Sequence, residues 1–227
     1  MVAQPDVNAD PNVVVTLQTK DMPWEPAGQP GVGIKVLERV NDPRKGRETS
    51  LMKFAPGASL PEELLTQRVD FFVIEGSVSD GIDQYGMHTF VRNSPGSTVR
   101  MSSAEGCTLY VKRREPIRKT DNERIVIDSK AAKWLDFPHR GATVLHLYRD
   151  VHGIETARFG RVHPDRKIPS HDHAMGEETL VLEGCLNDEY TAYEPGTWFR
   201  MPIGVPHAPY TEAPGCLMLI REGDLVW

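Results

Sequence analysis

The sequence contains little cysteine. Only Cys107, Cys185 and Cys216 occur in 227 residues, and no two of them form a CxxC pair. An odd and scattered set argues against the disulfide framework that holds many small secreted domains together. It is typical of a protein in a reducing compartment, so we expect a cytoplasmic location.

Long apolar runs are also missing. No stretch approaches the roughly 20 apolar residues that a helix needs to cross a bilayer. The first ten residues have no basic start and no apolar segment, so they do not resemble a secretory signal. We therefore expect no contact with a membrane.

Acidic residues outnumber basic residues. The chain has 26 lysines and arginines against 32 aspartates and glutamates, a formal net charge of -6. A nucleic-acid backbone is repelled by such a surface on average, so we expect no direct nucleic-acid binding. The one dense basic run, KRREPIRKTDNER at 112–124, is interpreted as a solvated linker.

Short β-type runs are what the sequence has in abundance. Examples are VGIKVLERV, DFFVIEG, TLVLEG and CLMLIRE, and Pro-Gly and Asn-Asp-Pro turn signals separate such runs. Short strands at close spacing favour a sandwich or barrel over alternating strands and helices. The sequence therefore predicts an all-β fold.

The two halves of the chain repeat one another. Glu75-Gly76-x-x-x-Asp80 recurs about 108 residues later as Glu183-Gly184-x-x-x-Asp188, and Gly106-Cys107 recurs as Gly215-Cys216. Anchors in the same order at nearly one offset predict two tandem β-barrels. The expected organisation is a flexible lead-in at 1–12, a first domain at 13–113, a linker at 114–122 and a second domain at 123–227.

The second half carries a cluster of metal-ligand residues. The segment PSHDHAMGEETLVLEG, residues 169–184, holds His171, His173 and Glu177. On a strand, residues two apart point to the same face, so the two imidazoles would lie together. A second segment, GTWFRMPIGVPH, ends at His207. Neutral imidazoles with a carboxylate suit a divalent metal such as zinc, iron, nickel or manganese.

These segments resemble the two motifs of the cupins, HxH-x3-E-x6-G and G-x5-PxGxxH. The surrounding residues are most similar to the cupin-like domain of ChrR-type anti-sigma factors. The resemblance implies that both domains are double-stranded β-helix (jelly-roll) barrels, a double cupin. It also implies that the metal ligands are His171, His173, Glu177 and His207.

The first domain is expected to lack such a site. Shifting the ligand positions back by about 108 residues leads to Glu63, Leu65, Val69 and Val99. Aliphatic side chains cannot replace imidazoles as metal ligands. We therefore expect one divalent metal per chain, in the second domain, with zinc favoured and iron, nickel or manganese as alternatives.

Two functions follow from the resemblance. The first is regulatory: a sensor of oxidative stress or of a small ligand, related to anti-sigma factors and acting through a protein partner. The chain lacks the His-x-x-x-Cys-x-x-Cys of the helical anti-sigma module. The alternative is a mononuclear non-haem metal-dependent dioxygenase that acts on a small diketone or aromatic ketone. An open coordination position in a pocket of substrate size would favour the enzyme, and a closed zinc site would favour the sensor.

Neither function comes with an assigned catalytic residue, and a small-molecule ligand is expected in both. Free sheet edges are commonly covered by a second copy, so a homodimer is also expected.

Overall fold

The computed structural model describes residues 4–42, 46–114, 123–150, 152–223 and 225. Within these ranges the chain is built almost entirely of strands, and its only helical segments are two three-residue 3₁₀ turns, η1 (Thr19–Asp21) and η2 (Pro138–Arg140). None of the described helices is long or apolar enough to cross a membrane. The predicted all-β fold is confirmed.

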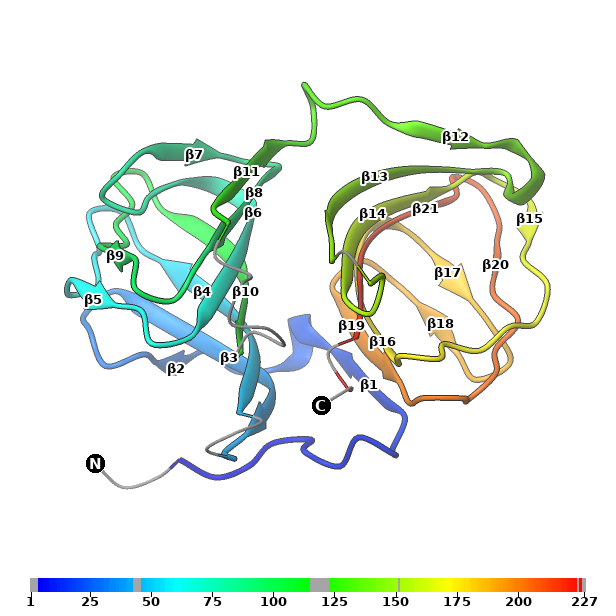
Figure 1. The fold of residues 1–227 in the computed structure, drawn as a ribbon, viewed down its shortest axis with the longest axis horizontal. Helices are drawn as coiled ribbons and strands as arrows, with labels where there is room; N and C mark the ends of the chain where they lie inside the picture. Colours follow the sequence, from blue (N-terminus) through cyan, green and yellow to red (C-terminus); the bar gives the residue numbers. More distant parts are fainter. Residues whose placement is uncertain (1–3, 43–45, 115–122, 151, 224, 226–227) are drawn as a thin grey trace. The chain divides into compact units, whose positions relative to one another are not determined.

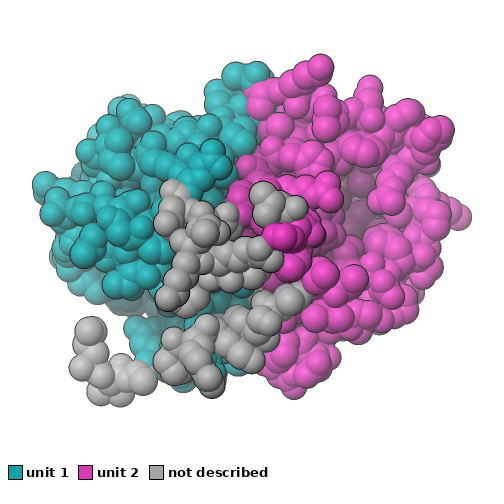
Figure 2. Space-filling view, viewed as in Figure 1, with its two compact units in different colours: residues 1–9, 23–131 teal, residues 10–22, 132–227 magenta. Residues whose placement is uncertain are grey.

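The chain divides into two compact units. Unit 1 comprises residues 1–9 and 23–131, and unit 2 comprises residues 10–22 and 132–227, as coloured in Figure 2.

Unit 2 is a barrel of two layers, visible in Figure 1 as one curved wall around β13, β14 and β21 and a second around β17, β18 and β20. The first layer is a seven-stranded sheet in the order β1-β19-β16-β21-β14-β13-β12, and the second has the order β15-β20-β17-β18. The bounds in the first layer are β1 (Val15–Gln18), β12 (Leu135–Phe137), β13 (Ala142–Arg149), β14 (Thr156–Val162), β16 (Glu177–Gly184), β19 (Thr197–Met201) and β21 (Cys216–Glu222). Those in the second are β15 (Arg166–Lys167), β17 (Leu186–Asn187), β18 (Ala192–Tyr193) and β20 (Tyr210–Thr211).

Unit 1 has the same plan. Its large sheet runs β11-β8-β6-β10-β4-β3-β2, with β7 paired to β6, and a small sheet pairs β5 with β9. The bounds are β2 (Glu25–Pro26), β3 (Val32–Val40), β4 (Arg47–Phe54), β5 (Glu63–Leu64), β6 (Arg68–Ser79), β7 (Gln84–Gly86), β8 (Thr89–Asn93), β9 (Thr98–Val99), β10 (Cys107–Arg114) and β11 (Ile125–Asp128).

Each core follows from the two-residue period of a strand. On β6, Val69, Phe71 and Val73 lie on one face of the strand and enter one buried apolar cluster, whereas Asp70 and Phe72 lie on the opposite face. On β19, Phe199 and Met201 enter the corresponding cluster of unit 2. Burial of this apolar area is the main favourable contribution to the stability of each barrel.

The first strand of each sequence repeat belongs to the sheet of the other repeat. Strand β1 pairs with β19 of unit 2, with Val15 opposite Arg200. Strand β11 pairs with β8 of unit 1, with Ile125 opposite Arg92. The compact units therefore differ from the predicted domains 13–113 and 123–227 by an exchange of first strands.

Residues 1–3 of the predicted lead-in and residues 115–122 of the predicted linker lie outside the described residues. Val7, within the lead-in that was expected to be flexible, exchanges two backbone hydrogen bonds with Arg39 at 2.9 and 2.8 Å. Asn8 donates from its side chain to the carbonyl of Leu37 at 2.7 Å. These contacts tie this part of the lead-in to β3.

Candidate metal centre

Three histidines of the second repeat come together where two loop segments pair. His171 and His207 form an isolated antiparallel bridge. The N–H of His171 donates to the carbonyl of His207 at 3.0 Å, and the N–H of His207 donates to the carbonyl of His171 at 2.9 Å. His173 follows two residues after His171, and Glu177 begins β16 four residues later. The backbone thereby fixes where each side chain starts.

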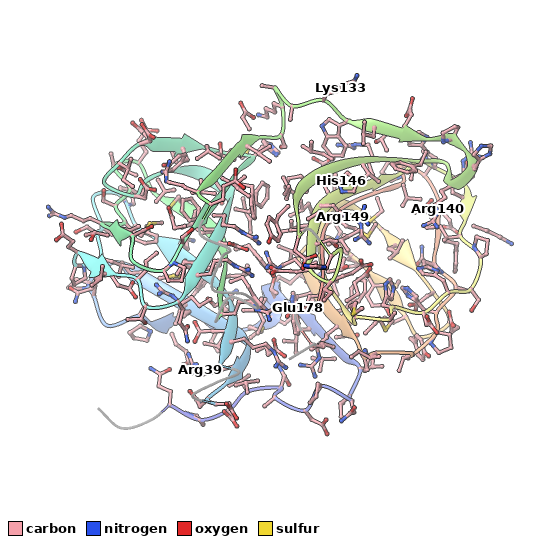
Figure 3. All side chains as sticks on the ribbon, viewed as in Figure 1. Arg39, Lys133, Arg140, His146, Arg149 and Glu178 are labelled. Carbon is pink, nitrogen blue, oxygen red and sulfur yellow. The ribbon has the colours of Figure 1, made fainter. Side chains whose placement is uncertain are left out.

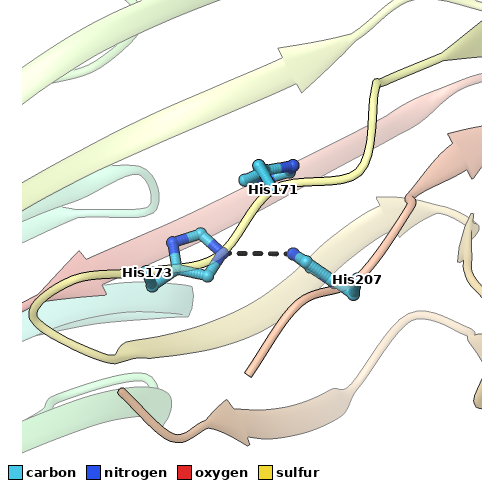
Figure 4. Close-up of side chains that lie close together, drawn as sticks. All are labelled: His171, His173 and His207. Carbon is cyan, nitrogen blue, oxygen red and sulfur yellow. Dashed lines mark hydrogen bonds between the residues drawn. The ribbon is translucent and has the colours of Figure 1, made fainter. Parts of the chain in front are cut away.

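The three imidazoles point at one another (Figure 4). Their ring centroids lie 4.9 to 5.2 Å apart. The Nε2 atoms of His173 and His207 are 3.1 Å apart. His173 and His207 are buried, and His171 is partly exposed. One candidate ligand atom from each ring lies within 4.8 Å of the other two, so the structure brings three of the four predicted ligands together as one group.

The Nδ1 atoms of His171 and His173 lie within hydrogen-bond distance of acceptor oxygens. Nδ1 of His171 lies 3.0 Å from the carbonyl oxygen of Pro169. Nδ1 of His173 lies 3.3 Å from Oε1 of Glu222 and 3.3 Å from Oε2 of Glu177. A carbonyl or an ionised carboxylate can only accept, so both rings donate an Nδ1–H here and keep the Nε2 lone pair.

His207 is oriented by a buried carboxylate, Asp188. Nδ1 of His207 lies 3.2 Å from Oδ2 of Asp188. The same oxygen accepts the hydroxyl of Tyr193 at 2.8 Å, and Oδ1 accepts the N–H groups of Tyr190 and Thr191 at 2.8 and 3.1 Å. Burial alone would raise the pKa of Asp188, but the hydrogen bonds from His207 and these groups lower it. Asp188 is therefore a fixed anion that leaves the Nε2 lone pair of His207 directed inward.

This arrangement fits a divalent metal ion. Two Nε2 lone pairs facing each other at 3.1 Å repel unless a cation or a proton lies between them. Nitrogens bound to one ion at about 2.0–2.1 Å lie about 3 to 3.4 Å apart, which agrees with the spacing of His173 and His207. Three convergent imidazole lone pairs are the donor set of many metal sites.

Glu177 occupies the other side of His173. Its Oε1 accepts the hydroxyl of Thr179 at 2.9 Å, and its Oε2 lies 3.7 Å from an amino nitrogen of Arg158. The ligand atoms of His173, Glu177 and Glu222 form a second group within 4.8 Å. The four predicted ligands thus divide between two overlapping groups that share His173, and the assignment of Glu177 as a ligand stays a prediction.

Charges around His173 shift the pKa values of its neighbours. Burial alone would lower the pKa of His173, but the carboxylates of Glu177 and Glu222 outweigh burial and raise it. Burial likewise opposes ionisation of Glu222, yet hydrogen bonds from His173 and Arg158 hold its pKa well below the usual range. Burial lowers the pKa of His171. These shifts favour an ionised Glu222 and an uncharged His171.

The group of ligands opens onto a cavity of about 120 Å³ in unit 2. Its walls are mainly aliphatic, with two arginines. Lining residues besides His171, His173, Glu177 and His207 include Arg140, Arg158, Gly160, Val162, Ile168, Leu186 and Met218.

Sequence reasoning missed Asp188 and Glu222 as site residues. Asp188 was recognised as an anchor of the internal repeat, and its distance from His207 in the chain hid its role. Glu222 belongs to no motif, and it reaches His173 because β21 pairs with β16, which places Glu222 opposite Glu177. Only the pairing of the strands could have identified it.

The first repeat carries no equivalent set among the described residues. Glu63 pairs with Val99 across β5 and β9, as His171 pairs with His207. Leu65, Val69 and Val99 are buried in the apolar cluster of unit 1. Glu63 is exposed and forms a bidentate ion pair with Arg113 at 2.8 and 3.0 Å.

Replacing Asp188 with asparagine should weaken metal binding by about ten- to a hundredfold. The carboxylate holds the His207 ring in one tautomer, and loss of such a partner typically costs this much affinity. Competition with a chelating dye would measure the change. Asp80→Asn is the matched control, because Asp80 is the equivalent residue of unit 1 and contacts Tyr85 and Arg124 instead of a histidine. Equal weakening by both variants would contradict the role of Asp188.

Comparisons with known proteins agree with the two-barrel plan. Among solved structures, a candidate dioxygenase from Nostoc punctiforme aligns with a TM-score of 0.80 at 16% identity, covering 96% of this chain and 85% of that one. A candidate glyoxylate-induced protein from Pseudomonas aeruginosa gives 0.77 at 16% identity, covering 98% and 92%. A variant of oxalate decarboxylase from Bacillus subtilis gives 0.67 at 11% identity, covering 93% and 78%. At such identities the likeness shows the fold alone.

The sequence itself places the chain more closely. Among curated proteins, no sequence matches it. The family model of the ChrR Cupin-like domain matches twice, over residues 12–116 and 122–226, once for each repeat. The chain therefore belongs to the family of ChrR Cupin-like domains, of which it contains two copies.

Proposed function

We propose that unit 2 binds one divalent metal ion and that the protein is a metal-dependent enzyme acting on a small molecule with oxygen donors. The observation that carries this proposal is the convergence of three imidazole lone pairs on the wall of a cavity. A metal held only for stability would need no such space beside it.

The residues that would hold the ion are His171, His173 and His207 through Nε2, with the carboxylate of Glu177 as the fourth donor. These donors suit zinc, iron, nickel or manganese, and an ion of this kind supplies Lewis acidity toward oxygen donors. Asp188 keeps His207 oriented.

The remaining residues would prepare the space beside the ion. The aliphatic walls exclude bulk water, which strengthens electrostatic interactions inside the cavity. Arg158 supplies a fixed positive charge on the same wall as the ligands. The carboxylate of Glu222 contacts Arg158 at 2.9 Å and His173 at 3.3 Å. It therefore couples the position of the Arg158 guanidinium group to that of the metal ligand His173.

The size of the cavity suits a small substrate. Its volume of about 120 Å³ is comparable to that of a cavity that holds benzene, about 150 Å³. A small diketone or a small organic acid fits this space. The structural neighbours named as a candidate dioxygenase and an oxalate decarboxylase support an enzyme by analogy of fold.

A regulatory role is the second candidate, and membership of the ChrR Cupin-like family favours it. In that case zinc would saturate its four positions with the three histidines and Glu177, and a protein partner would read the state of the site. The cavity beside the ligands would then serve a small effector instead of a substrate.

Metal content and oxygen consumption separate the two candidates. The protein would be purified without added metal and without a histidine tag, then analysed by mass spectrometry for metals. One equivalent of iron, nickel or manganese with oxygen uptake that depends on a small diketone supports the enzyme. One equivalent of zinc with no turnover, also after iron loading, supports the regulator. Absence of bound metal would overturn both.

A further inference from the structure

The internal repeat shows where the cavity of unit 2 comes from. Val162 on β14 pairs with Cys216 on β21. Phe54 on β4 pairs with Cys107 on β10. Cys107 and Cys216 are equivalent anchors of the repeat, so Val162 occupies in unit 2 the position that Phe54 occupies in unit 1.

Two residues earlier on each strand, the difference in side-chain size between the two units is larger. Unit 2 has Gly160 where unit 1 has Met52, and two residues apart on a strand means the same, inward face. Met52 and Phe54 belong to the buried core of unit 1, whereas Gly160 and Val162 line the cavity of unit 2. Unit 2 therefore lacks side-chain volume beside its candidate ligands that the other copy of the same barrel has.

The polar wall of this space is cationic. Arg158 donates to Glu222 at 2.9 Å and to the hydroxyl of Thr156 at 3.1 Å, which uses only part of its five N–H donors. Arg140, in η2 and labelled in Figure 3, is exposed. It also lines the cavity. Among the described residues, Arg140 has no hydrogen-bond or ion-pair partner.

The charges of the site favour an anion. A divalent ion, Arg140 and Arg158 together carry more positive charge than the carboxylates of Glu177, Glu222 and Asp188 carry negative charge. A small cavity with low-dielectric walls concentrates that excess, so it attracts anions. A guanidinium group also matches the two oxygens of a carboxylate in geometry.

We propose that the cavity of unit 2 binds a small carboxylate, with its charged end between the metal centre and Arg140 and Arg158, and its apolar end against Gly160. This inference rests on the proposed metal centre and names the class of molecule that the centre takes. A neutral molecule of the same size would lack the contribution of the two arginines.

Two isosteric probes test the charge preference. Pyruvate and diacetyl have the same number of non-hydrogen atoms, and only pyruvate is an anion. Each would be titrated into cobalt-loaded protein in carboxylate-free buffer, with the visible absorption of cobalt and calorimetry as readouts. We expect pyruvate to bind at least about tenfold more tightly than diacetyl. Equal affinities would overturn the proposal.

Arg140→Gln and Gly160→Met test the two walls separately. Arg140→Gln should weaken pyruvate by about ten- to a hundredfold and leave diacetyl unchanged, because a charge-assisted contact is lost. Gly160→Met restores the residue of unit 1 and should abolish binding of both probes while one equivalent of cobalt stays bound. A Cβ at Gly160 would lie 2.9 Å from Cδ1 of Ile220, the end of a flexible side chain that can shift.

The outcomes separate this inference from the proposed function. Wild-type protein that binds cobalt but not pyruvate would overturn the carboxylate proposal and leave the metal centre standing. Protein that binds no cobalt would overturn both. Unchanged pyruvate affinity in Arg140→Gln, an exposed substitution that does not threaten folding, would overturn the carboxylate proposal even if Gly160→Met failed to fold.

Discussion

Replacing His173 with alanine should lower the affinity for the metal at least about a hundredfold, so that the purified protein contains almost no metal. His173 supplies one of three imidazole lone pairs and belongs to both groups of ligand atoms, so its loss breaks the whole centre. Loss of a partner that only orients a ligand already costs about ten- to a hundredfold, and loss of the ligand itself costs more. Mass spectrometry of metals, with circular dichroism to confirm folding, measures the result.

Glu63→Ala is the matched control for this prediction. Glu63 is the residue of unit 1 at the position of His171, and it is paired on the surface with Arg113. An exposed ion pair contributes about 0–1 kcal/mol, so the variant should fold normally and keep its metal. Equal metal loss in His173→Ala and Glu63→Ala would show that the ligands lie elsewhere.

The sequence was sufficient to predict the all-β fold and the double cupin, because both depend on local patterns. Strand periodicity, turn residues and two motifs at a repeated spacing are each contained in short stretches of chain. The choice of His171, His173 and His207 as candidate ligands also depended on these short motifs. Their Nε2 atoms converge because backbone pairing between His171 and His207 brings the two motifs together.

Features that depend on pairing between distant strands could not be predicted. The exchange of β1 and β11 between the two sheets leaves no local signal, because each segment has the same pattern whichever sheet it joins. Glu178 alternates with Glu177 along β16, and this alternation alone would favour a solvent-facing side chain. In the structure Glu178 is only 1% exposed. Its neighbours across the sheet are Arg200 and Arg221, and opposite charges on adjacent strands make a buried carboxylate tolerable.

Gly184→Ala should destabilise unit 2 by about 2–5 kcal/mol. Gly184 ends β16, and β17 begins two residues later in the other sheet, so this glycine is the corner at which the chain changes layers. Its φ is +70°, and a Cβ there would lie 1.9 Å from the carbonyl oxygen of Gly215. An alanine costs about 1–2 kcal/mol for the left-handed backbone, and moving a packed backbone costs about 1–3 kcal/mol more. At the usual dependence on denaturant, the urea midpoint should fall by roughly 1–2 M.

Gly204→Ala separates the two causes. Gly204 has nearly the same φ, +73°, but nothing lies within 4 Å of the position of its Cβ. The variant should therefore lose only the backbone contribution of about 1–2 kcal/mol. If both variants shift the midpoint equally, the close approach of Gly184 to Gly215 does not limit the corner. If instead Gly184→Ala alone shows the large loss of stability and loses its metal as well, the corner at Gly184 holds Asp188 and the second sheet in place beside the histidines. The metal site would then depend on this one backbone contact.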